Sequence, residues 1–365
     1  MMDNSKMKER VTLAQVAARA GLSTTAASLI LNGRAGTGLS SDAHKRVREA
    51  AQQLGYRPNL MARSLRMEKS ATLGFVSDMV ASTRYASPMI TGALRAARER
   101  QHTLLVVETE GDPAEQDLAV STLLDRQVDG IILASARSHA VAPELPSLAV
   151  PVLLLNSVSA DARFASVIPD EFEGGRLAAQ HLVDRGFDRI HVLGASPETM
   201  SSPAVTVQVK RRLQGIYSVL DQAGAQAVFM PVNDMQWNPD EGYEAMTRLL
   251  AKDRSIKALL SLNDPLSFGA YQALQQAGLS IPDEVSVISF DDDDLVAYLR
   301  PRLTTVALPF EQMGRKAVNL ILDGELEVLE HLEPMALRHR QSTLPGPDDG
   351  RPGVKVSRST SNCTP

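Results

Sequence analysis

The sequence predicts an N-terminal all-α headpiece with a helix-turn-helix and a hinge helix, followed by an α/β core of two doubly wound parallel-sheet lobes. Short capped helices follow one another closely before residue 58, whereas from residue 71 short apolar runs alternate with helical stretches. The charge changes as well. Eleven Lys and Arg against five Asp and Glu give residues 1–68 a net charge of +6, which leaves −11 for the remainder of a chain whose net charge is −5. A length of 365 residues is enough for two or three domains.

The first two helices are expected to form the helix-turn-helix. Thr12 and Gln15 make a capping box, and the apolar spacing continues to about Ala20, where Gly21 ends the helix. Ser23 is the next N-cap, and the turn before it is so short that the second helix must pack across the first. An ordinary pair of packed helices is the alternative interpretation of this stretch alone.

A third helix is expected from a cap at Ser40 or Ser41 to Gly55. Its outer face is basic, with Lys45, Arg46 and Arg48. Such a small unit has little core of its own, so its expected role is to present the second helix. A basic face is by itself equally consistent with a solvated surface, but together with a helix-turn-helix it favours contact with DNA.

The hinge follows Pro58, which is a suitable first residue for a short helical stretch over 59–66. At this point two segments, VTLAQVAARAGLSTTAASLILNG and RVREAAQQLGYRPNLMARSL, closely resemble the DNA-binding headpiece and hinge of the lac repressor family of bacterial transcription regulators. The resemblance is nearly continuous from Val11 to Leu65. It implies a sequence-specific DNA-binding regulator.

The body of the chain resembles the periplasmic-binding-protein-like core of the same family from about Leu73 to Thr343, in segments such as HLVDRGFDRIHVLG and SLNDPLSFGAYQAL. The resemblance implies three crossings between lobes, near 168–169, 300–303 and 331–332. The expected domains are a headpiece at 1–58, a hinge helix and linker at 59–70, an effector-binding and dimerisation core at 71–343 and a disordered tail at 344–365. Within the core, the N-lobe comprises 71–168 and 301–331 and the C-lobe comprises 169–300 and 332–343.

Base contacts are expected from the exposed first turn of the second helix, which in a helix-turn-helix enters the major groove. These residues are Thr24, Thr25 and Ser28, with Leu29 one turn further on. Many members of the family carry Arg at the Leu29 position, and leucine cannot form the bidentate contact that Arg makes with guanine. Phosphate contacts are assigned to Thr12, Ser23 and Asn32, with capping or turn formation as an equal alternative, and by resemblance to Ser40 and Tyr56.

The hinge implies a wedge in the minor groove and a dimer. By resemblance, Leu65 inserts at the operator centre and kinks the duplex, Ala62 permits close approach and Asn59 reaches the backbone. A core position is the alternative for an isolated leucine. Because a helix of about eight residues is unstable alone in water, the hinge should order only against a partner hinge and DNA. A homodimer that reads a pseudo-palindromic operator is therefore expected.

An effector pocket is expected between the lobes, at the carboxyl ends of the strands. Candidate polar residues are Asp78, Asn156, Arg212, Asn263 and Asp291, with Trp237 and Phe310 as apolar walls. Arg212, Trp237 and Asn263 match positions that line the family's cleft. Asp170 is a further candidate, for which helix capping is an equal alternative. Sugars are the effector class that the family favours, nucleosides and other metabolites stay open, and Leu308 makes the pocket less polar.

Several other classes of protein and site are disfavoured. The acidic run Asp291–Asp294 lacks neighbouring His or Cys, and Cys363 is the only cysteine, so no metal, cofactor or intramolecular disulfide is expected. No catalytic motif, membrane span or secretory signal is recognised, which indicates a cytoplasmic protein that is not an enzyme. A solute receptor and an α/β hydrolase are the alternatives. We expect a repressor whose operator affinity depends on an effector acting as inducer or corepressor.

Overall fold

The computed structural model describes residues 11–31, 38–56, 69–83, 86–137, 139–141, 150–202, 205–232 and 237–346. Its contacts divide the chain into two units, residues 1–70 and 71–365, which are described separately. Asn32, the hinge residues Asn59, Ala62 and Leu65, and the tail from residue 347 lie outside the described residues.

The headpiece contains α1 (Leu13–Ala20), α2 (Thr24–Leu31) and α3 (Ser41–Leu54). The capping box of Thr12 and Gln15 is present, and Gly21 and Gly55 end α1 and α3 in the left-handed conformation, with φ of 64° and 67°. The three helices enclose one small core, to which α1 contributes Val16, α2 Ile30 and α3 Val47. Local signals therefore mark both ends of α1 and α3.

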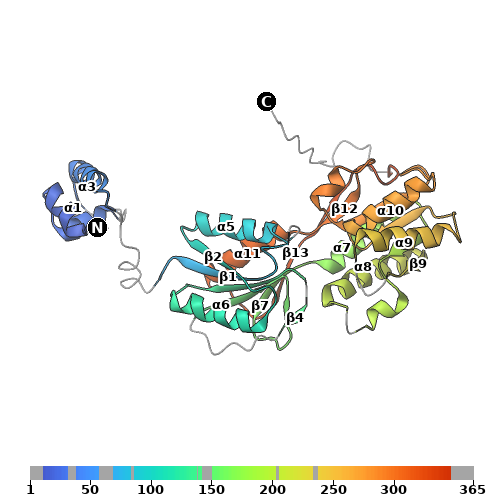
Figure 1. Ribbon diagram of the computed structural model, residues 1–365, viewed down its shortest axis with the longest axis horizontal. Coiled ribbons are helices and arrows are strands. Elements are labelled where there is room, and N and C mark those ends of the chain that lie inside the picture. Colours follow the sequence, from blue (N-terminus) through green and yellow to red (C-terminus); the bar gives the residue numbers. More distant parts are fainter. Residues whose placement is uncertain are drawn as a thin grey trace, which may run out of the picture. The chain divides into compact units, whose positions relative to one another are not determined.

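The first lobe has a six-stranded parallel sheet in the order β13-β7-β5-β3-β1-β2. Its strands are β1 (Thr72–Asp78), β2 (Thr103–Glu108), β3 (Ile131–Ser135), β5 (Val152–Leu155), β7 (Ala165–Pro169) and β13 (Glu330–Glu333). Helices α5 (Pro88–Glu99) and α11 (Phe310–Asp323) cover one face and α6 (Pro113–Asp125) covers the other (Figure 1). The short strands β4 (Ala140–Val141) and β6 (Val158–Ser159) pair separately.

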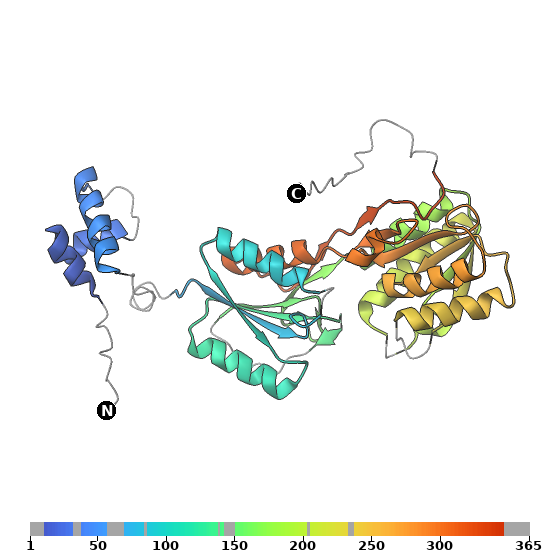
Figure 2. The same ribbon diagram turned by 45° about the horizontal axis from the view of Figure 1, so that its top comes forward.

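The second lobe has a six-stranded sheet in the order β14-β12-β11-β10-β8-β9. Its strands are β8 (Arg189–Leu193), β9 (Gln226–Met230), β10 (Ala258–Ser261), β11 (Ser286–Asp291), β12 (Thr304–Ala307) and β14 (Ala336–Arg338). Helices α7 (Glu171–Val183) and α8 (Val207–Ala223) cover one face, and α9 (Pro239–Leu250) and α10 (Asp264–Gln276) cover the other (Figure 2). The 3-10 helices are η1 (Pro197–Met200) and η3 (Asp294–Ala297).

The sheets correct three details of the expected lobes. The expected N-lobe included 301–331, but β12 pairs with β11 and β14 in the second sheet, so the second crossing follows Ala307. β13 pairs with β7 through Glu333, so the third crossing follows that residue rather than Leu332. In addition, β14 runs antiparallel to β12, so the second sheet is not entirely parallel. A strand's sheet depends on its partners, which its own apolar pattern does not specify.

On three faces of the two sheets, the two covering helices cross at a pair of glycines, one in each helix. A Cβ at Gly175 in α7 would lie 2.1 Å from the Arg212 carbonyl oxygen, and one at Gly215 in α8 would lie 2.0 Å from the Phe172 carbonyl oxygen. The same reciprocal approach occurs at Gly92 with Gly314, between α5 and α11, and at Gly242 with Gly269, between α9 and α10. Backbones thus come closer at these crossings than side chains would allow.

Candidate functional site

The exposed face of α2 carries the residues expected to read DNA. Ala27 and Ile30 are buried against the headpiece core, whereas Thr24 and Thr25 are exposed. Ser28 and Leu29 are partly buried. The first turn of the helix therefore presents two threonine side chains to solvent, as contact with base edges in a groove requires.

The residues assigned to phosphates hold the headpiece together in this structure. Thr12 Oγ1 accepts a hydrogen bond from Gln15 N at 3.4 Å, and Ser23 Oγ accepts one from Ala26 N at 3.1 Å. Ser40 Oγ likewise accepts from Ala43 N at 3.2 Å, and the Tyr56 ring packs against the core. The three hydroxyl side chains that cap helices are all exposed, so capping leaves them accessible to a phosphate oxygen.

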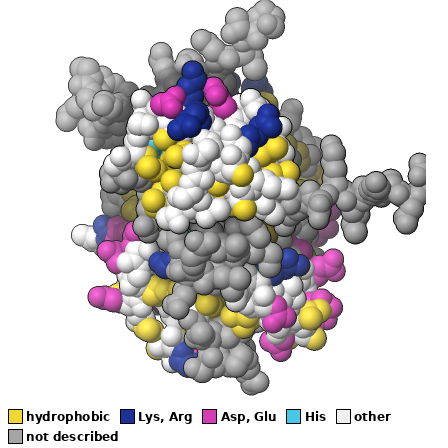
Figure 3. Space-filling model, turned by 90° about the vertical axis from the view of Figure 1, so that its left-hand side faces the viewer, with side chains coloured by type: hydrophobic (Ala, Val, Ile, Leu, Met, Phe, Trp, Pro, Cys, Tyr) yellow, Lys and Arg dark blue, Asp and Glu magenta, His cyan; other side chains and the backbone are white. Residues whose placement is uncertain are grey.

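The headpiece charge comes largely from residues whose positions are not described. Of the eleven Lys and Arg in residues 1–68, the described residues include Arg19, Lys45, Arg46 and Arg48. Arg46 pairs with Asp42 at 3.1 Å. On the face shown in Figure 3, Lys and Arg side chains are interspersed with Asp and Glu side chains. The other seven Lys and Arg lie outside the described residues.

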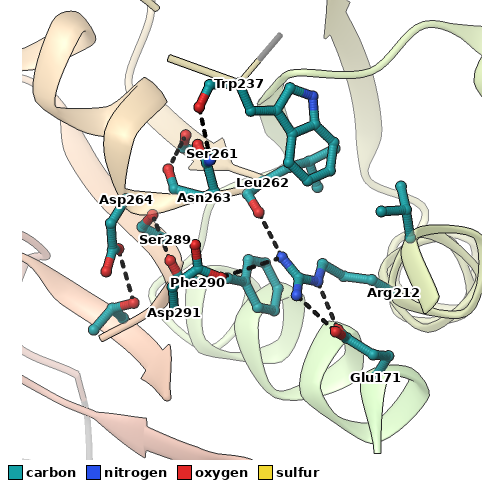
Figure 4. Close-up of polar contacts among 12 residues, drawn as sticks. Glu171, Arg212, Trp237, Ser261, Leu262, Asn263, Asp264, Ser289, Phe290 and Asp291 are labelled. Carbon is teal, nitrogen blue, oxygen red and sulfur yellow. Dashed lines mark hydrogen bonds and ion pairs between the residues drawn. The ribbon is translucent and has the colours of Figure 1, made fainter. Parts of the chain in front are cut away.

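Arg212 is the centre of a buried polar cluster in the second lobe. Its Nε and Nη2 donate to the two carboxylate oxygens of Glu171 at 2.6 and 2.8 Å, and its Nη1 donates to the Leu262 carbonyl at 2.5 Å (Figure 4). The guanidinium lies 4.2 Å from the ring centroid of Phe290. Arg212 and Glu171 are each 4% exposed. A bidentate pair in this geometry fixes the guanidinium plane.

Glu171 was not among the candidate residues from the sequence. It stands in the first turn of α7, immediately after Asp170, which was a candidate. Asp170 caps that helix, because its Oδ1 accepts from Glu173 N at 3.2 Å, and the capping alternative therefore has direct support. The sequence could have suggested Glu171 because it is an acidic residue beside the first crossing between the lobes. It gave no indication that the partner of Glu171 is Arg212, 41 positions away.

Asp291 lies at the carboxyl end of β11, with its Oδ1 4.0 Å from Arg212 Nη1. Its side chain is 23% exposed and its φ is 107°, a strained conformation for a non-glycine residue. Burial raises the pKa of Asp291 to about 6, although Arg212 acts in the opposite direction. An acceptor with this pKa, partly open to solvent, is suited to a ligand hydroxyl.

Asn263 and Trp237 are joined by a hydrogen bond and lie beside the Arg212 cluster (Figure 4). Asn263 Oδ1 accepts from Leu266 N at 2.9 Å and so caps α10, while its Nδ2 donates to the Trp237 carbonyl at 3.0 Å. The Trp237 indole donates to the Gly194 carbonyl at 3.2 Å. These contacts fix a partly buried indole beside the cluster (Figure 4).

Asp264, next to the Asn263 cap, is a second buried acid that the sequence did not single out. Its carboxylate accepts from Thr305 Oγ1 at 3.0 Å and from Asp293 N at 2.8 Å. Burial, together with the nearby Asp291 carboxylate, raises the pKa of Asp264 well above its usual range. Asp264 and Asp291 therefore lie in distinct environments, the first buried and hydrogen-bonded and the second partly exposed. Among the described residues, no group of three or more His, Cys, Asp or Glu could hold a metal ion.

The remaining candidates lie in the first lobe. Asn156 is 3% exposed and donates from Nδ2 to the Ser135 carbonyl at 2.9 Å. Asp78 ends β1 and accepts from Ala136 N at 2.6 Å, and burial raises the pKa of its carboxyl. Phe310, expected as a pocket wall, is only 6% exposed because, at the start of α11, it packs into the core of the first lobe. Leu308 is partly buried and contacts the cores of both lobes.

If an effector donates a hydroxyl to the Asp291 carboxylate, its binding should depend on pH. The ionised carboxylate is the stronger acceptor, and its fraction falls as pH decreases through about 6. We expect affinity to be constant above that pH and to fall by up to about tenfold per pH unit below it. Calorimetric titrations of the wild type and Asp291→Asn would test this, since the variant should bind weakly with a flatter pH profile. An equally steep profile in the variant would assign the titration to another group.

Residues 12–59 match the bacterial regulatory proteins of the lacI family, and residues 179–343 match the periplasmic binding protein-like domain. This chain belongs to the lac repressor family. Among relatives, the ribose operon repressor of Escherichia coli K12 is 29% identical over 316 residues, covering 85% of this chain and 92% of the repressor. The transcriptional repressor PurR of Actinobacillus pleuropneumoniae serotype 3 is 27% identical, covering 86% and 90%.

Solved structures of the lac repressor family extend the comparison to the fold. The lac repressor dimer bound to operator and the anti-inducer ONPF aligns with a TM-score of 0.72 and 26% identity, covering 92% of this chain and all of that one. A family member from Enterococcus faecium with bound ribose aligns with a TM-score of 0.58 and 26% identity over 75% of this chain and 99% of that one. The match to a headpiece and a two-lobed core confirms the predicted fold class and the predicted family. Among the described residues, no helix has the length and apolar character that crossing a bilayer requires.

Proposed function

We propose that this protein is a homodimeric transcriptional repressor whose affinity for operator DNA is set by a small neutral effector bound at the Arg212 cluster. The observation that carries the proposal is the presence, in one chain, of a helix-turn-helix with exposed Thr24 and Thr25 and a buried Arg212–Glu171 pair beside the partly open Asp291. The first feature suits a DNA groove, and the second suits a ligand with directed hydroxyls.

The effector class follows from the groups that remain available. Glu171 already neutralises the Arg212 guanidinium, and Asp291 contributes an acceptor, so a strongly anionic ligand would meet an unfavourable field. A sugar or related polyol donates hydroxyls to Asp291 and stacks its apolar side on the Trp237 indole. The relative with bound ribose and the ribose operon repressor support the sugar assignment. Leu308, which contacts the cores of both lobes, makes the surroundings of the effector less polar. Nucleosides are therefore the alternative effector class.

Control of DNA binding requires that the effector bind two states of the dimer unequally. We propose that closure of the lobes on the effector changes the relation between the two first lobes and thereby decides whether the two hinges can pair. Such coupling is typically about 1–3 kcal/mol. An inducer would favour unpaired hinges and a corepressor would favour paired ones.

The α2 residues lead to a specific prediction about the operator. Leu29 can make apolar contact, for example with a thymine methyl group, but cannot form the bidentate bond to guanine. Selection of bound duplexes with Leu29→Arg should therefore enrich guanine at one position of each half-site, with discrimination of about 1–3 kcal/mol, while the half-site spacing stays unchanged. An unchanged consensus in the variant would remove Leu29 from the base-reading set.

The test of the proposed function is selection from random duplex DNA with the full-length protein at a fixed salt concentration, with and without a panel of sugars and nucleosides. A pseudo-palindrome whose enrichment changes with one compound is the expected result. A solute receptor would bind a compound without enriching DNA, and a hydrolase would convert the compound to product. Either of these outcomes would overturn the repressor assignment.

A further inference from the structure

One edge of the first sheet is available for a further strand. Among the described residues, β13 is the terminal strand of this sheet and pairs with β7 alone. The Ser166 N–H of β7 donates to the Leu329 carbonyl at 3.1 Å, so Leu329 directs its backbone groups toward β7. Successive residues of a strand direct their backbone groups to opposite sides, so Glu330 and Leu332 direct theirs away from the sheet. Such an edge is a template for pairing with another segment.

Apolar side chains and a buried ring nitrogen mark this edge. Leu332 of β13 is 43% exposed, and Val328 and Leu329, just before the strand, are 55% and 42% exposed. His331 Nε2 is buried but has no hydrogen-bond partner among the described residues. A strand lying alongside would cover the apolar side chains and could supply a partner for the ring nitrogen.

The edge is also acidic. Four glutamates stand within residues 325–333. Arg211 pairs with Glu330 and Lys316 pairs with Glu333, each at 2.7 Å, so the four acids outnumber these two cations. Opposite charges on neighbouring strands attract and like charges repel. The edge therefore suits an extended segment that carries both apolar and basic side chains.

A segment of this composition lies in the part of the chain that follows Gly346. Residues 354–358 read VKVSR, in which the two valines alternate with polar residues and two of the five residues are cationic. Alternation with a period of two is typical of a strand with one apolar face, and valine favours strands. The segment contains no acidic residue, no Gly and no Pro. It therefore complements the β13 edge in charge and in pattern.

The VKVSR segment is long enough in sequence from the second lobe to reach β13. Arg185, just after α7, donates from Nε to the Leu344 carbonyl at 2.6 Å, so the described chain ends beside the carboxyl end of α7. At the other end of α7, the Asp170 N–H donates to the Glu333 carbonyl at 2.8 Å. A helix of 13 residues is about 20 Å long. The eight residues 347–354 span up to about 26 Å when extended, so the segment can reach the carboxyl end of β13 in the same chain.

We propose that the VKVSR segment pairs with β13 of its own chain as an antiparallel strand. The direction is antiparallel because the segment arrives at the carboxyl end of β13 and continues toward its amino end. In one register the facing residues are Lys355 with Glu333, Val356 with Leu332, Ser357 with His331 and Arg358 with Glu330. Each cation then faces an acid, the two apolar side chains meet, and the serine hydroxyl supplies a partner for the buried ring nitrogen.

Paired in this way, the VKVSR segment connects the two lobes. Thr343 Oγ1 lies 2.9 Å from His181 Nε2, and Leu344 N donates to Ser286 Oγ at 3.0 Å, so the chain before the segment is attached to the second lobe. β13 belongs to the sheet of the first lobe. The pairing therefore adds a connection beside the three crossings, and it requires neither operator nor effector.

The first experiment tests the register by disulfide formation in the full-length protein, with Cys363→Ser as the background. Leu332→Cys is combined with Val356→Cys, because facing residues of an antiparallel pair lie within the Cα separation that a disulfide allows. Mild oxidation followed by mass spectrometry of the peptides should show a disulfide within one chain.

The control for this experiment combines Leu332→Cys with Ser357→Cys. The side chain at 357 lies on the opposite face of the strand, so this pair should form a disulfide at least tenfold more slowly. Equal rates for the two pairs would mean that the segment passes the edge without a register. A disulfide between two chains, or none in either pair, would equally overturn the proposal.

The second experiment leaves β13 unchanged and measures hydrogen exchange of the peptide spanning residues 326–335 by mass spectrometry. In the proposed register the Val356 N–H donates to β13, whereas the Ser357 N–H points away from it. Val356→Pro should therefore increase exchange of the outward-facing β13 amides at least tenfold, and Ser357→Pro, the matched control, should leave it as in the wild type. Identical exchange in all three proteins would show that the segment does not pair with β13.

Discussion

Replacing Arg212 by methionine is expected to lower the free energy of unfolding by about 3–5 kcal/mol. The variant leaves the Glu171 carboxylate, which is 4% exposed, without its bidentate partner, and it removes the guanidinium that lies 4.0 Å from the Asp291 carboxylate. Two buried acids would then have to be protonated or solvated for the lobe to fold. Trp237 is the only tryptophan in the chain and lies beside the cluster, so its fluorescence during urea unfolding reports on this lobe.

The double variant Arg212→Met with Glu171→Met separates the charge from the packing. With both members of the pair replaced by apolar side chains, most of the lost stability should return. The attraction within a buried ion pair is largely offset by the free energy of removing both charges from water. Effector binding should be lost in both variants. Arg315→Met is the control, because the Arg315–Glu99 pair is exposed and its loss should change stability by less than about 1 kcal/mol. A double variant as unstable as the single one would contradict this account.

Gly175→Ala is expected to lower both the stability of the second lobe and its affinity for the effector. Alanine favours a helix by about 1 kcal/mol over glycine, but a Cβ at this position would lie 2.1 Å from the Arg212 carbonyl oxygen, so α7 and α8 must separate. We expect a net loss of stability of about 1–3 kcal/mol. Because the crossing also sets the distance from Glu171 to Arg212, effector affinity should fall with it.

The neighbouring Gly174 is the matched control for this crossing. A Cβ there would lie 2.5 Å from the Met335 sulfur, which is the far end of a flexible side chain and can move aside. Gly174→Ala should therefore be much less destabilising than Gly175→Ala, although both glycines stand in α7. Urea unfolding followed by Trp237 fluorescence compares the two variants directly, and equal losses would mean that helix separation is not the cause.

Much of the headpiece could be predicted from the sequence because its boundaries depend on local chemistry. The Thr12 capping box, the Ser40 cap and the left-handed Gly21 and Gly55 act within about one helical turn, so a short window of sequence contains each signal. Many strands of both lobes were recognisable for a similar reason, since buried parallel strands are nearly continuous apolar runs, whereas β7, β12, β13 and β14 were not among the predicted runs. The candidates Arg212, Trp237, Asn263 and Asp291 came from strand ends and from family resemblance, and the structure gathers them in one lobe.

Sequence patterns predicted the headpiece helices, the alternation of apolar runs with helices and the residue types available for a ligand, and family resemblance supplied the DNA-binding role. The folded chain was needed to show that β12 joins the second sheet, that Glu171 is the partner of Arg212, and that Asp78 lies near Ser157 on the α6 side. The physical reason is the range of the interactions. Caps and periodicity act between residues near in sequence, whereas sheet partners, buried ion pairs and glycine crossings join residues tens of positions apart, whose proximity exists only after the chain has folded.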